Sequence, residues 1–225
     1  NLPLKILDEN KEMLLVETAK IRPEFIQEFG GVIKIAEVIS NTDRHDEIEI
    51  NLEKANLYTG TENKIEYYIA AHNTNLLSFV EDCLKDYFKS LKLKALYRSH
   101  SEPSKLVNKN ILKMGVDLVI FKNIIGKTIT IFDPREFKKR DLGRPEVDYM
   151  KVISIRLAKI LVNISKVKDD ELLMDPFSGS GTILQEALLK NVNVIGLDND
   201  SSAVQQAKKN LDWLSNHYKI KSNYR

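Results

Sequence analysis

The eight residues from Asp175 to Thr182 read Asp-Pro-Phe-Ser-Gly-Ser-Gly-Thr, and they combine an acidic side chain with two closely spaced glycines. Because glycine has no Cβ, a ligand can approach the backbone of such a turn closely. If a helix begins where the turn ends, free backbone N–H groups also face that ligand. A carboxylate beside the turn suits a nucleoside that carries a charged amino-acid tail. The structural alternative is an ordinary strand-to-helix turn with two packing glycines.

The chain on both sides of this turn predicts the elements that position it. The apolar run 172–174 predicts a short buried strand, and residues 183–189 have the pattern of a helix. A second buried strand is predicted over 192–197, and it ends at Asp198. An acidic residue that ends the second strand, about 20 residues after a glycine turn, is where nucleotide-binding α/β folds hold ribose hydroxyls. Asp200 is predicted to cap the helix that follows.

Composition limits the remaining possibilities. The 225 residues, 43% of them hydrophobic, can bury one large core or two small ones. A net charge of +2, from 34 basic and 32 acidic residues, does not by itself argue for nucleic-acid binding, so any basic surface must be local. Cys83 is the single cysteine, which excludes an internal disulfide and indicates a reducing, cytoplasmic compartment. We also expect no metal site and no membrane segment, because the histidines are scattered and no apolar run is long enough.

Two groups of α/β elements are predicted before the glycine turn. The first has a strand at 13–16, a short helix at 23–29, a strand at 32–39, a loop at 41–47 and a linker at 56–63. The second alternates strands and helices and forms a compact α/β region of its own. Its predicted strands are 65–71, 93–97, 116–121 and 127–132, and its predicted helices are 76–91 and 103–114.

Basic residues recur at helical spacing in this second group. Lys105, Lys109 and Lys113 lie four residues apart, so they line one face of the predicted helix. Lys94 and Arg98 precede that helix. Such a face can contact the phosphates of a nucleic acid, although a merely solvated face has the same pattern.

Several segments together resemble one protein family. The glycine turn resembles motif I of S-adenosylmethionine-dependent amino-methyltransferases, which methylate exocyclic nitrogens of nucleobases. The order of four segments is similar to that of the tRNA guanine-10 N2-methyltransferase family. They are KRDLGRP at 139–145, RLAKILVNIS at 156–165, DPFSGSGTILQEAL at 175–188 and VIGLDND at 194–200.

This resemblance implies an α/β fold with three parts. Residues 1–56 would be an N-terminal ferredoxin-like domain, 57–137 a THUMP-like RNA-binding domain, and 138–225 the first half of a Rossmann-like methyltransferase sheet. The implied reaction is methyl transfer to the exocyclic N2 of guanine in tRNA, at position 10. The expected S-adenosylmethionine site comprises Asp175, Pro176, Phe177, Ser178, Gly179, Gly181, Thr182, Asp198 and Asn199, and the expected tRNA contacts are Lys94, Arg98, Lys105, Lys109 and Lys113.

The sequence departs from the family pattern in one respect. Enzymes of this type use an Asn/Asp-Pro-Pro-aromatic motif to accept the protons of the amine and to stack on the base, and no such motif occurs here. Catalytic residues are therefore unassigned, and two strands alone would leave an open sheet. We expect the other half to come from a second polypeptide, or from residues beyond the 225 given, or else the chain to be a truncated product.

Three other functions are compatible with parts of the sequence. A non-catalytic tRNA-binding subunit, or a truncated remnant, would keep the cofactor turn without the catalytic motif. A circularly permuted DNA amino-methyltransferase would place that motif upstream, where residues 1–170 contain none. An NAD-dependent oxidoreductase is disfavoured, since the turn lacks the third glycine or alanine of dinucleotide-binding turns.

Overall fold

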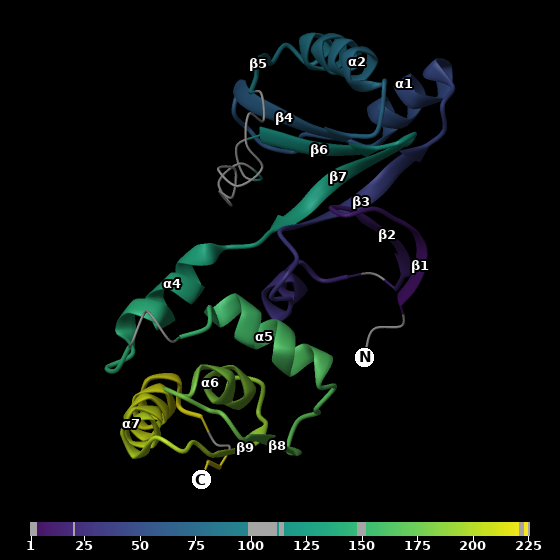
Figure 1. Cartoon of the computed structure of the whole chain (residues 1–225). Coiled ribbons are helices and arrows are strands. Elements are labelled where there is room, and N and C mark those ends of the chain that lie inside the picture. Colours follow the sequence, from purple (N-terminus) through teal and green to yellow (C-terminus); the bar gives the residue numbers. More distant parts are fainter. Residues whose placement is uncertain are drawn as a thin grey trace. The chain divides into compact units, whose positions relative to one another are not determined.

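A computed structural model describes residues 4–19, 21–98, 112, 115–147, 152–220 and 223–224 (Figure 1). The chain divides into two compact units, each described by itself below. Strands and helices occur in both, which confirms the predicted α/β class. Unit 1 comprises Asn1–Ile26 and Ile33–Phe132, and unit 2 comprises Gln27–Val32 and Asp133–Arg225.

A five-stranded mixed sheet forms the centre of unit 1, with the strand order β3-β7-β6-β4-β5. β4 is parallel to β5 and β6, whereas β7 is antiparallel to β3 and β6. Parallel neighbours need a crossover connection, and helix α2 lies between β4 and β5 along the chain. The strands are β3 (Lys34–Asn41), β4 (Lys64–His72), β5 (Lys94–Tyr97), β6 (Gly115–Phe121) and β7 (Ile124–Ile131).

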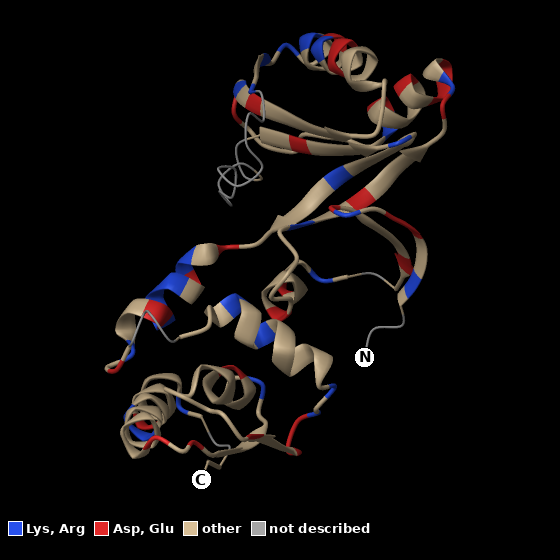
Figure 2. Ribbon diagram, in the orientation of Figure 1, with Lys and Arg blue, Asp and Glu red and all other residues tan. Residues whose placement is uncertain are grey.

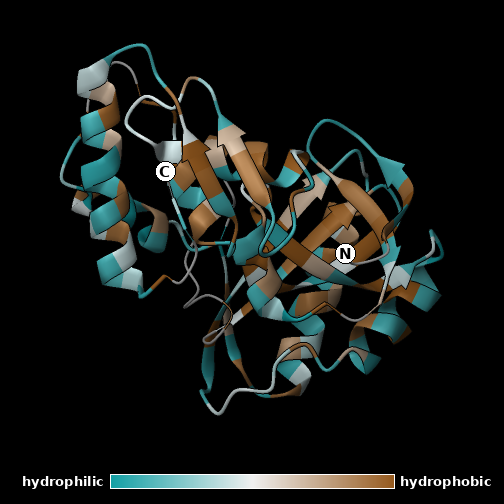
Figure 3. Ribbon diagram, turned by 90° about the horizontal axis from the view of Figure 1, so that it is seen from below, coloured by the Kyte–Doolittle hydropathy of each residue, from teal (hydrophilic) through white to brown (hydrophobic). Residues whose placement is uncertain are grey.

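Helices α1 (His45–Lys54) and α2 (Leu77–Ser90) pack on this sheet (Figure 1). Val80, Leu84 and Phe88 recur at helical spacing on α2, and all three are buried against apolar side chains of the strands. The strands of unit 1 are correspondingly hydrophobic in Figure 3. The predicted helix 76–91 is thereby confirmed, and it marks the main core of unit 1.

The predicted loop 41–47 is wrong over its second half, because α1 begins at His45. Its first turn contains Asp46 and Glu47, and acidic side chains stabilise the N-terminal end of a helix. Ile48 and Leu52, four residues apart, are both buried in the core. The polar start of the segment therefore belongs to an amphipathic helix whose apolar face the sheet covers.

A hairpin of β1 (Leu4–Glu9) and β2 (Leu14–Thr18) precedes the sheet. The Asn10 side chain accepts hydrogen bonds from the backbone N–H groups of Glu12 and Met13, both at 2.7 Å, which shapes the hairpin turn. Glu12 also approaches the ring Nδ1 of His72 to 2.9 Å. The short 3₁₀ helix η1 (Pro23–Glu28) follows the hairpin, within the helix predicted at 23–29.

The strand pairing of unit 1 crosses one of the predicted domain boundaries. β3 lies before residue 57, yet it pairs with β7 from Lys34 opposite Ile131 to Asn41 opposite Ile124. Helix α4 (Pro134–Gly143) similarly runs across residues 137 and 138. The division into 1–56, 57–137 and 138–225 stays a prediction about domains.

Unit 2 places helices around two parallel strands (Figure 1). Among the described residues, its core comprises eight buried apolar side chains, Leu184, Val194 and Leu214 among them, and Trp213 packs against this core. Val194 also forms an isolated parallel bridge with Tyr224. After α4, the elements are α5 (Ile155–Ile164), β8 (Leu172–Asp175), α6 (Thr182–Leu188), β9 (Asn193–Gly196) and α7 (Ser201–Tyr218).

Within the ranges given above, no helix combines the length and the apolar character needed to cross a membrane. Over the same ranges, no three side chains of histidine, cysteine, aspartate or glutamate are grouped so that they could hold a metal ion.

We expect the thiol of Cys83 to react slowly in the folded protein. Burial raises its pKa from 9.0 to about 11, and the Glu49 carboxylate adds to the shift. This shift lowers the thiolate fraction at neutral pH about 100-fold, and the thiolate is the form that reacts. Alkylation at pH 8, followed by mass spectrometry, should be slow in buffer and fast in denaturant. Equal rates would show that Cys83 is not held in the core.

Candidate functional site

The glycine turn lies at the carboxyl ends of two parallel strands. β8 ends at Asp175, and the turn 176–181 leads into α6. β9 ends at Gly196, directly opposite Asp175 in the strand register. In open α/β sheets, ligands bind outside the carboxyl ends of the strands, so this edge is the position that the fold favours for a site.

Both glycines of the turn have backbone conformations that other residues adopt with strain. Gly179 has φ +49° and Gly181 has φ +83°, in the left-handed region. A Cβ on Gly181 would lie 3.2 Å from the Cβ of Ala207, whereas a Cβ on Gly179 would meet no atom within 4 Å. Gly181 is therefore required by conformation and by packing, while Gly179 faces open space.

Asp198 ties the turn to the end of β9. One carboxylate oxygen accepts a hydrogen bond from the backbone N–H of Gly179 at 2.8 Å, and the other accepts from the N–H of Asp200 at 3.0 Å. These backbone hydrogen bonds, to Asp200 first and then to Gly179, lower the pKa of Asp198. Asp198 is thus held as a carboxylate beside the turn.

Asp175 presents an unsatisfied oxygen at the start of the turn. The residue is only 9% exposed, and one of its oxygens accepts the backbone N–H of Phe177 at 3.0 Å. The other oxygen, Oδ2, is buried and has no hydrogen-bond partner among the described residues. A buried carboxylate oxygen without a donor is costly, so this atom is suited to receive one from a ligand.

The structure brings most of the predicted cofactor residues together, in different roles. Ser178 is buried, and its N–H donates to the Leu197 carbonyl at 2.9 Å. The Thr182 hydroxyl accepts a hydrogen bond from Arg144 at 2.9 Å, so it supports the turn from behind. Phe177 is 88% exposed. Pro176 and Asn199 are also exposed, and the predicted cap by Asp200 is confirmed through its bond to the Ser202 N–H.

The predicted RNA contacts belong to unit 1, whereas the glycine turn belongs to unit 2. Lys94 begins β5 and is exposed, and Arg98 follows the same strand. The guanidinium of Arg98 pairs with the Glu66 carboxylate at 2.7 Å, which partly neutralises it. Lys105, Lys109 and Lys113 lie outside the described residues.

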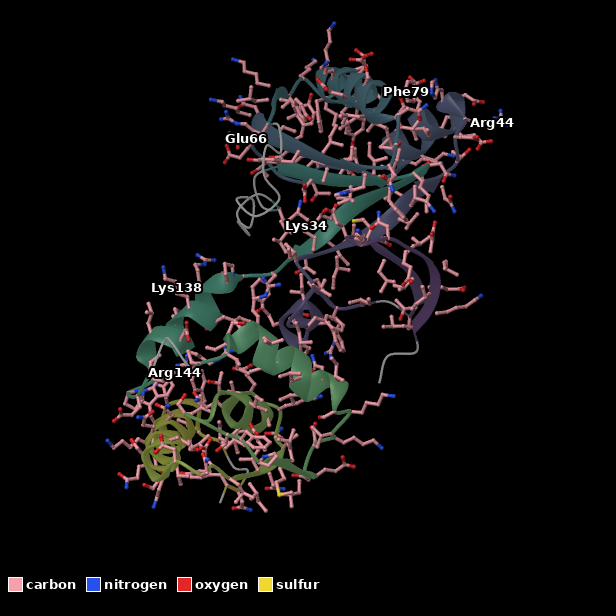
Figure 4. All side chains as sticks on the ribbon, viewed as in Figure 1. Lys34, Arg44, Glu66, Phe79, Lys138 and Arg144 are labelled. Atoms are coloured by element: carbon pink, nitrogen blue, oxygen red, sulfur yellow. The ribbon has the colours of Figure 1, made fainter. Side chains whose placement is uncertain are left out.

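Two arginines behind the turn were not predicted as site residues. Arg140 donates to the Glu186 carboxylate at 3.0 Å, in a pair whose side chains are 11% and 2% exposed. Burial raises the pKa of Glu186, and the charges of Arg140 and Lys159 oppose this shift. The Arg144 side chain is fully buried and reaches Thr182 from the C-terminal end of α4 (Figure 4). The four-residue spacing of the two arginines was the available sequence signal.

Asn210 on α7 was also missed, and a single asparagine in a helix gives no sequence signal. Its side chain is completely buried and forms hydrogen bonds to the backbone of Glu146 and of Ser180. It therefore connects three segments: the helix itself, the residues after α4, and the glycine turn.

The Asp133-Pro134 pair, the only sequence near α4 that resembles part of the catalytic motif, has a structural role. Asp133 is the N-cap of α4, where its carboxylate accepts the N–H of Arg135 at 3.0 Å. The same carboxylate pairs with the Arg135 guanidinium at 2.7 Å. Lys and Arg residues, blue in Figure 2, occupy much of the rest of α4, and Lys138 and Lys139 among them are exposed.

Comparison with known proteins identifies the unit that carries the turn. Residues 145–222 match a protein family described as UPF0020, RMKL-like, methyltransferase domain. The segment that contains the turn is thus similar to a methyltransferase domain. A solved structure of a possible methylase from Clostridium difficile 630 shares the fold, with a TM-score of 0.50 and 15% identity over 99% of this chain and 68% of that one.

Two curated relatives are tRNA (guanine(10)-N2)-dimethyltransferases. The one from Methanothermobacter thermautotrophicus is 33% identical over 97 residues, which are 43% of this chain and 28% of the relative. The one from Pyrococcus abyssi is 33% identical over 89 residues, which are 40% of this chain and 26% of the relative. The matched part of the chain thus spans little more than a quarter of the length of these relatives.

We expect alanine to be tolerated less well at Gly181 than at Gly179. In Gly181→Ala the new methyl group crowds Ala207, and the residue must also adopt an unfavourable φ. This substitution should therefore lower the free energy of unfolding by roughly 1–3 kcal/mol. Gly179→Ala incurs only the left-handed conformation, at about 1 kcal/mol. Urea unfolding of both variants measures the difference. A larger loss of stability for Gly179→Ala would contradict the packing account.

We expect the buried pair Arg140–Glu186 to be costly to break from one side. Arg140→Met leaves Glu186 without its closest cation and should lower the free energy of unfolding by about 3–5 kcal/mol. Replacing both partners, as Arg140→Met with Glu186→Leu, should cost less, since the most deeply buried charge, that of Glu186, is removed and only the more exposed Lys159 loses its partner. The exposed pair Lys139–Glu136 is the control, and Lys139→Ala should change stability by about 0–1 kcal/mol. Similar losses of stability in urea unfolding for the single variant, the double variant and the control would refute the idea that an unpaired buried charge is the main cost.

Proposed function

We propose that unit 2 binds S-adenosylmethionine and that the chain is part of an enzyme that methylates the exocyclic N2 of guanine in tRNA, at position 10. The observation that carries the proposal is the buried Oδ2 of Asp175, which has no hydrogen-bond partner within the described part of the chain and lies beside a glycine turn that Asp198 holds in place. The methyltransferase match of residues 145–222 and the names of the two curated relatives support it.

The residues of the turn fit this cofactor by their chemistry. Oδ2 of Asp175 can accept a hydrogen bond from the ammonium group of an amino-acid tail. Asp198 uses one lone pair of each oxygen for backbone N–H groups and keeps the others for ribose hydroxyls. Gly179 leaves open space above the turn for close approach of a ligand. When bound, S-adenosylmethionine supplies the methyl group as part of a sulfonium.

The transfer step needs groups that this sequence does not contain. The exocyclic N2 of guanine is a poor nucleophile, because its lone pair is delocalised into the ring. The Asn/Asp-Pro-Pro-aromatic motif that would accept its protons is absent from the sequence, and Asp133-Pro134 caps a helix instead. We therefore assign cofactor binding, and not transfer, to the residues described. We do not propose a second polypeptide, because none of the comparisons supports one.

For residues 57–137 we propose a THUMP-like role in holding tRNA, in a cytoplasmic protein. The basic residues Lys94, Lys105, Lys109 and Lys113 support the proposal by their charge and spacing, and the lone Cys83 supports the compartment. Arg98 contributes less to it, since Glu66 already pairs with this side chain. A tRNA-binding protein without transferase activity remains the rival, favoured by the missing catalytic motif.

Calorimetric titration with S-adenosylmethionine tests the cofactor site. Asp175→Ala removes the acceptor for the ammonium group, so we expect binding to weaken about 10- to 100-fold, as for the loss of a charged hydrogen bond. Asp169→Ala, at an exposed position in the loop before β8, is the control and should leave affinity unchanged. Unchanged affinity of the Asp175→Ala protein would refute the proposed site.

A second variant tests the open space at Gly179. Gly179→Val directs a branched side chain into the space above the turn, where no atom lies within 4 Å of the added Cβ. We expect S-adenosylmethionine binding to be abolished while the protein remains folded by circular dichroism. Normal binding by a folded Gly179→Val protein would exclude the turn as the cofactor site.

Titration with tRNA at several salt concentrations tests unit 1. Replacing Lys105, Lys109 and Lys113 together by glutamine should weaken binding and reduce the slope of log K against log salt, by about one for each phosphate that the protein no longer neutralises. Glutamine at Lys54, Lys85 and Lys89, on α1 and α2, makes a control of equal charge change. Equal slopes for the two triple variants would indicate that Lys105, Lys109 and Lys113 do not contact tRNA phosphates.

A further inference from the structure

Asn210 forms three hydrogen bonds from a position that is completely buried on α7. Its side-chain oxygen accepts the backbone N–H of Glu146 at 3.0 Å. Its side-chain nitrogen donates to the carbonyl of Glu146 and to the carbonyl of Ser180, both at 2.9 Å. The amide group therefore uses both of its donors and its acceptor.

This arrangement requires the chemistry of an asparagine. Aspartate has nearly the same shape, but as a carboxylate it has no donor for the two carbonyls. Alanine would leave the N–H and the carbonyl of Glu146 and the carbonyl of Ser180, which are partly buried, without these partners, and an unsatisfied polar group away from water costs free energy.

The glycine turn benefits from hydrogen bonds to neighbouring elements, because its glycines are conformationally free. Glycine loses more conformational freedom on folding than any other residue, and Gly179 and Gly181 flank Ser180. Two such hydrogen bonds come from the end of β9, through the N–H groups of Ser178 and Gly179. Another is the bond from Asn210 on α7 to the Ser180 carbonyl.

The bond to Ser180 orients the peptide group that carries the Gly181 N–H. A peptide unit is planar, so fixing the Ser180 carbonyl also fixes the direction of that N–H, which donates to the Ser178 carbonyl at 2.8 Å. Ala207, one turn before Asn210 on α7, packs against Gly181. One face of α7 thus supports the turn by packing and by a hydrogen bond.

The same amide holds the segment that follows α4. Glu146 is bound through both its N–H and its carbonyl, and its carboxylate pairs with Lys209, the neighbour of Asn210, at 2.6 Å. Arg144, two residues earlier, reaches Thr182 at the other end of the turn. The segment 144–146 is therefore linked to the turn at Ser180, through Asn210, and at Thr182.

We propose that Asn210 is a positioning residue for the cofactor turn, which keeps the turn in its binding conformation by linking Ser180 to Glu146. The inference rests on the proposed S-adenosylmethionine site and adds a residue that makes no contact with the cofactor itself. Its action is on the backbone of the turn, so it affects affinity for the cofactor beyond any effect on stability.

The test compares three variants with the wild-type chain by calorimetric titration with S-adenosylhomocysteine and by urea unfolding. Asn210→Ala removes all three hydrogen bonds, and Asn210→Asp keeps the shape and the acceptor but removes both donors. Leu214→Val, one turn further along α7 at a fully buried core position, loses stability without touching the turn. Affinities are compared at a temperature where every variant is folded.

We expect Asn210→Ala and Asn210→Asp to weaken binding about 10-fold or more, while Leu214→Val keeps the wild-type affinity. Wild-type affinity in both Asn210 variants, or an equal loss of affinity in Leu214→Val, would overturn the positioning role and leave the cofactor site standing. If Asn210→Ala does not fold, the isosteric Asn210→Asp decides the matter alone. Failure of the wild-type chain to bind would instead overturn the proposed function, and this inference with it.

Discussion

The hydrogen bond from the Gly179 N–H to the Asp198 carboxylate is the interaction on which the site depends. It joins the turn after β8 to Asp198, two residues beyond the end of β9, and the parallel pairing of the two strands brings these segments together. The bond holds a glycine in a left-handed conformation and keeps an ionised carboxylate at the strand ends. Without it, the turn and the acidic residue would be separate loop features.

Behind this bond, the turn is supported mostly by polar and charged groups. Arg140 pairs with buried Glu186, Arg144 reaches Thr182, and Asn210 holds Ser180. Buried charges add little net stability, because the loss of hydration offsets their attraction, but they are specific in geometry. This suits a turn whose glycines have no side chains to pack. The apolar core beneath, around Leu184 and Leu214, supplies the stability.

Unit 1 shows where local sequence patterns succeed and fail. Helix α2 was predictable, because its apolar residues recur at helical spacing and one face of the helix is buried. Helix α1 was missed because its first turn is polar and its buried positions, Ile48 and Leu52, are few. The pairing of β3 with β7 was also beyond prediction, since nothing local in either strand specifies a partner more than 80 residues away.

The sequence by itself determined the α/β class and the strand–turn–helix around Asp175. It also determined that a second strand, ending near the acidic residue Asp198, follows the turn. Each of these depends on local backbone preferences or short-range spacing, which the amino-acid order encodes directly. Tertiary structure alone decided that Asp198 holds Gly179, that Oδ2 of Asp175 has no partner among the described residues, and that Arg140, Arg144 and Asn210 support the turn from behind. Such contacts join residues 19 to 46 positions apart, and they exist only once burial has brought the helices onto the strands.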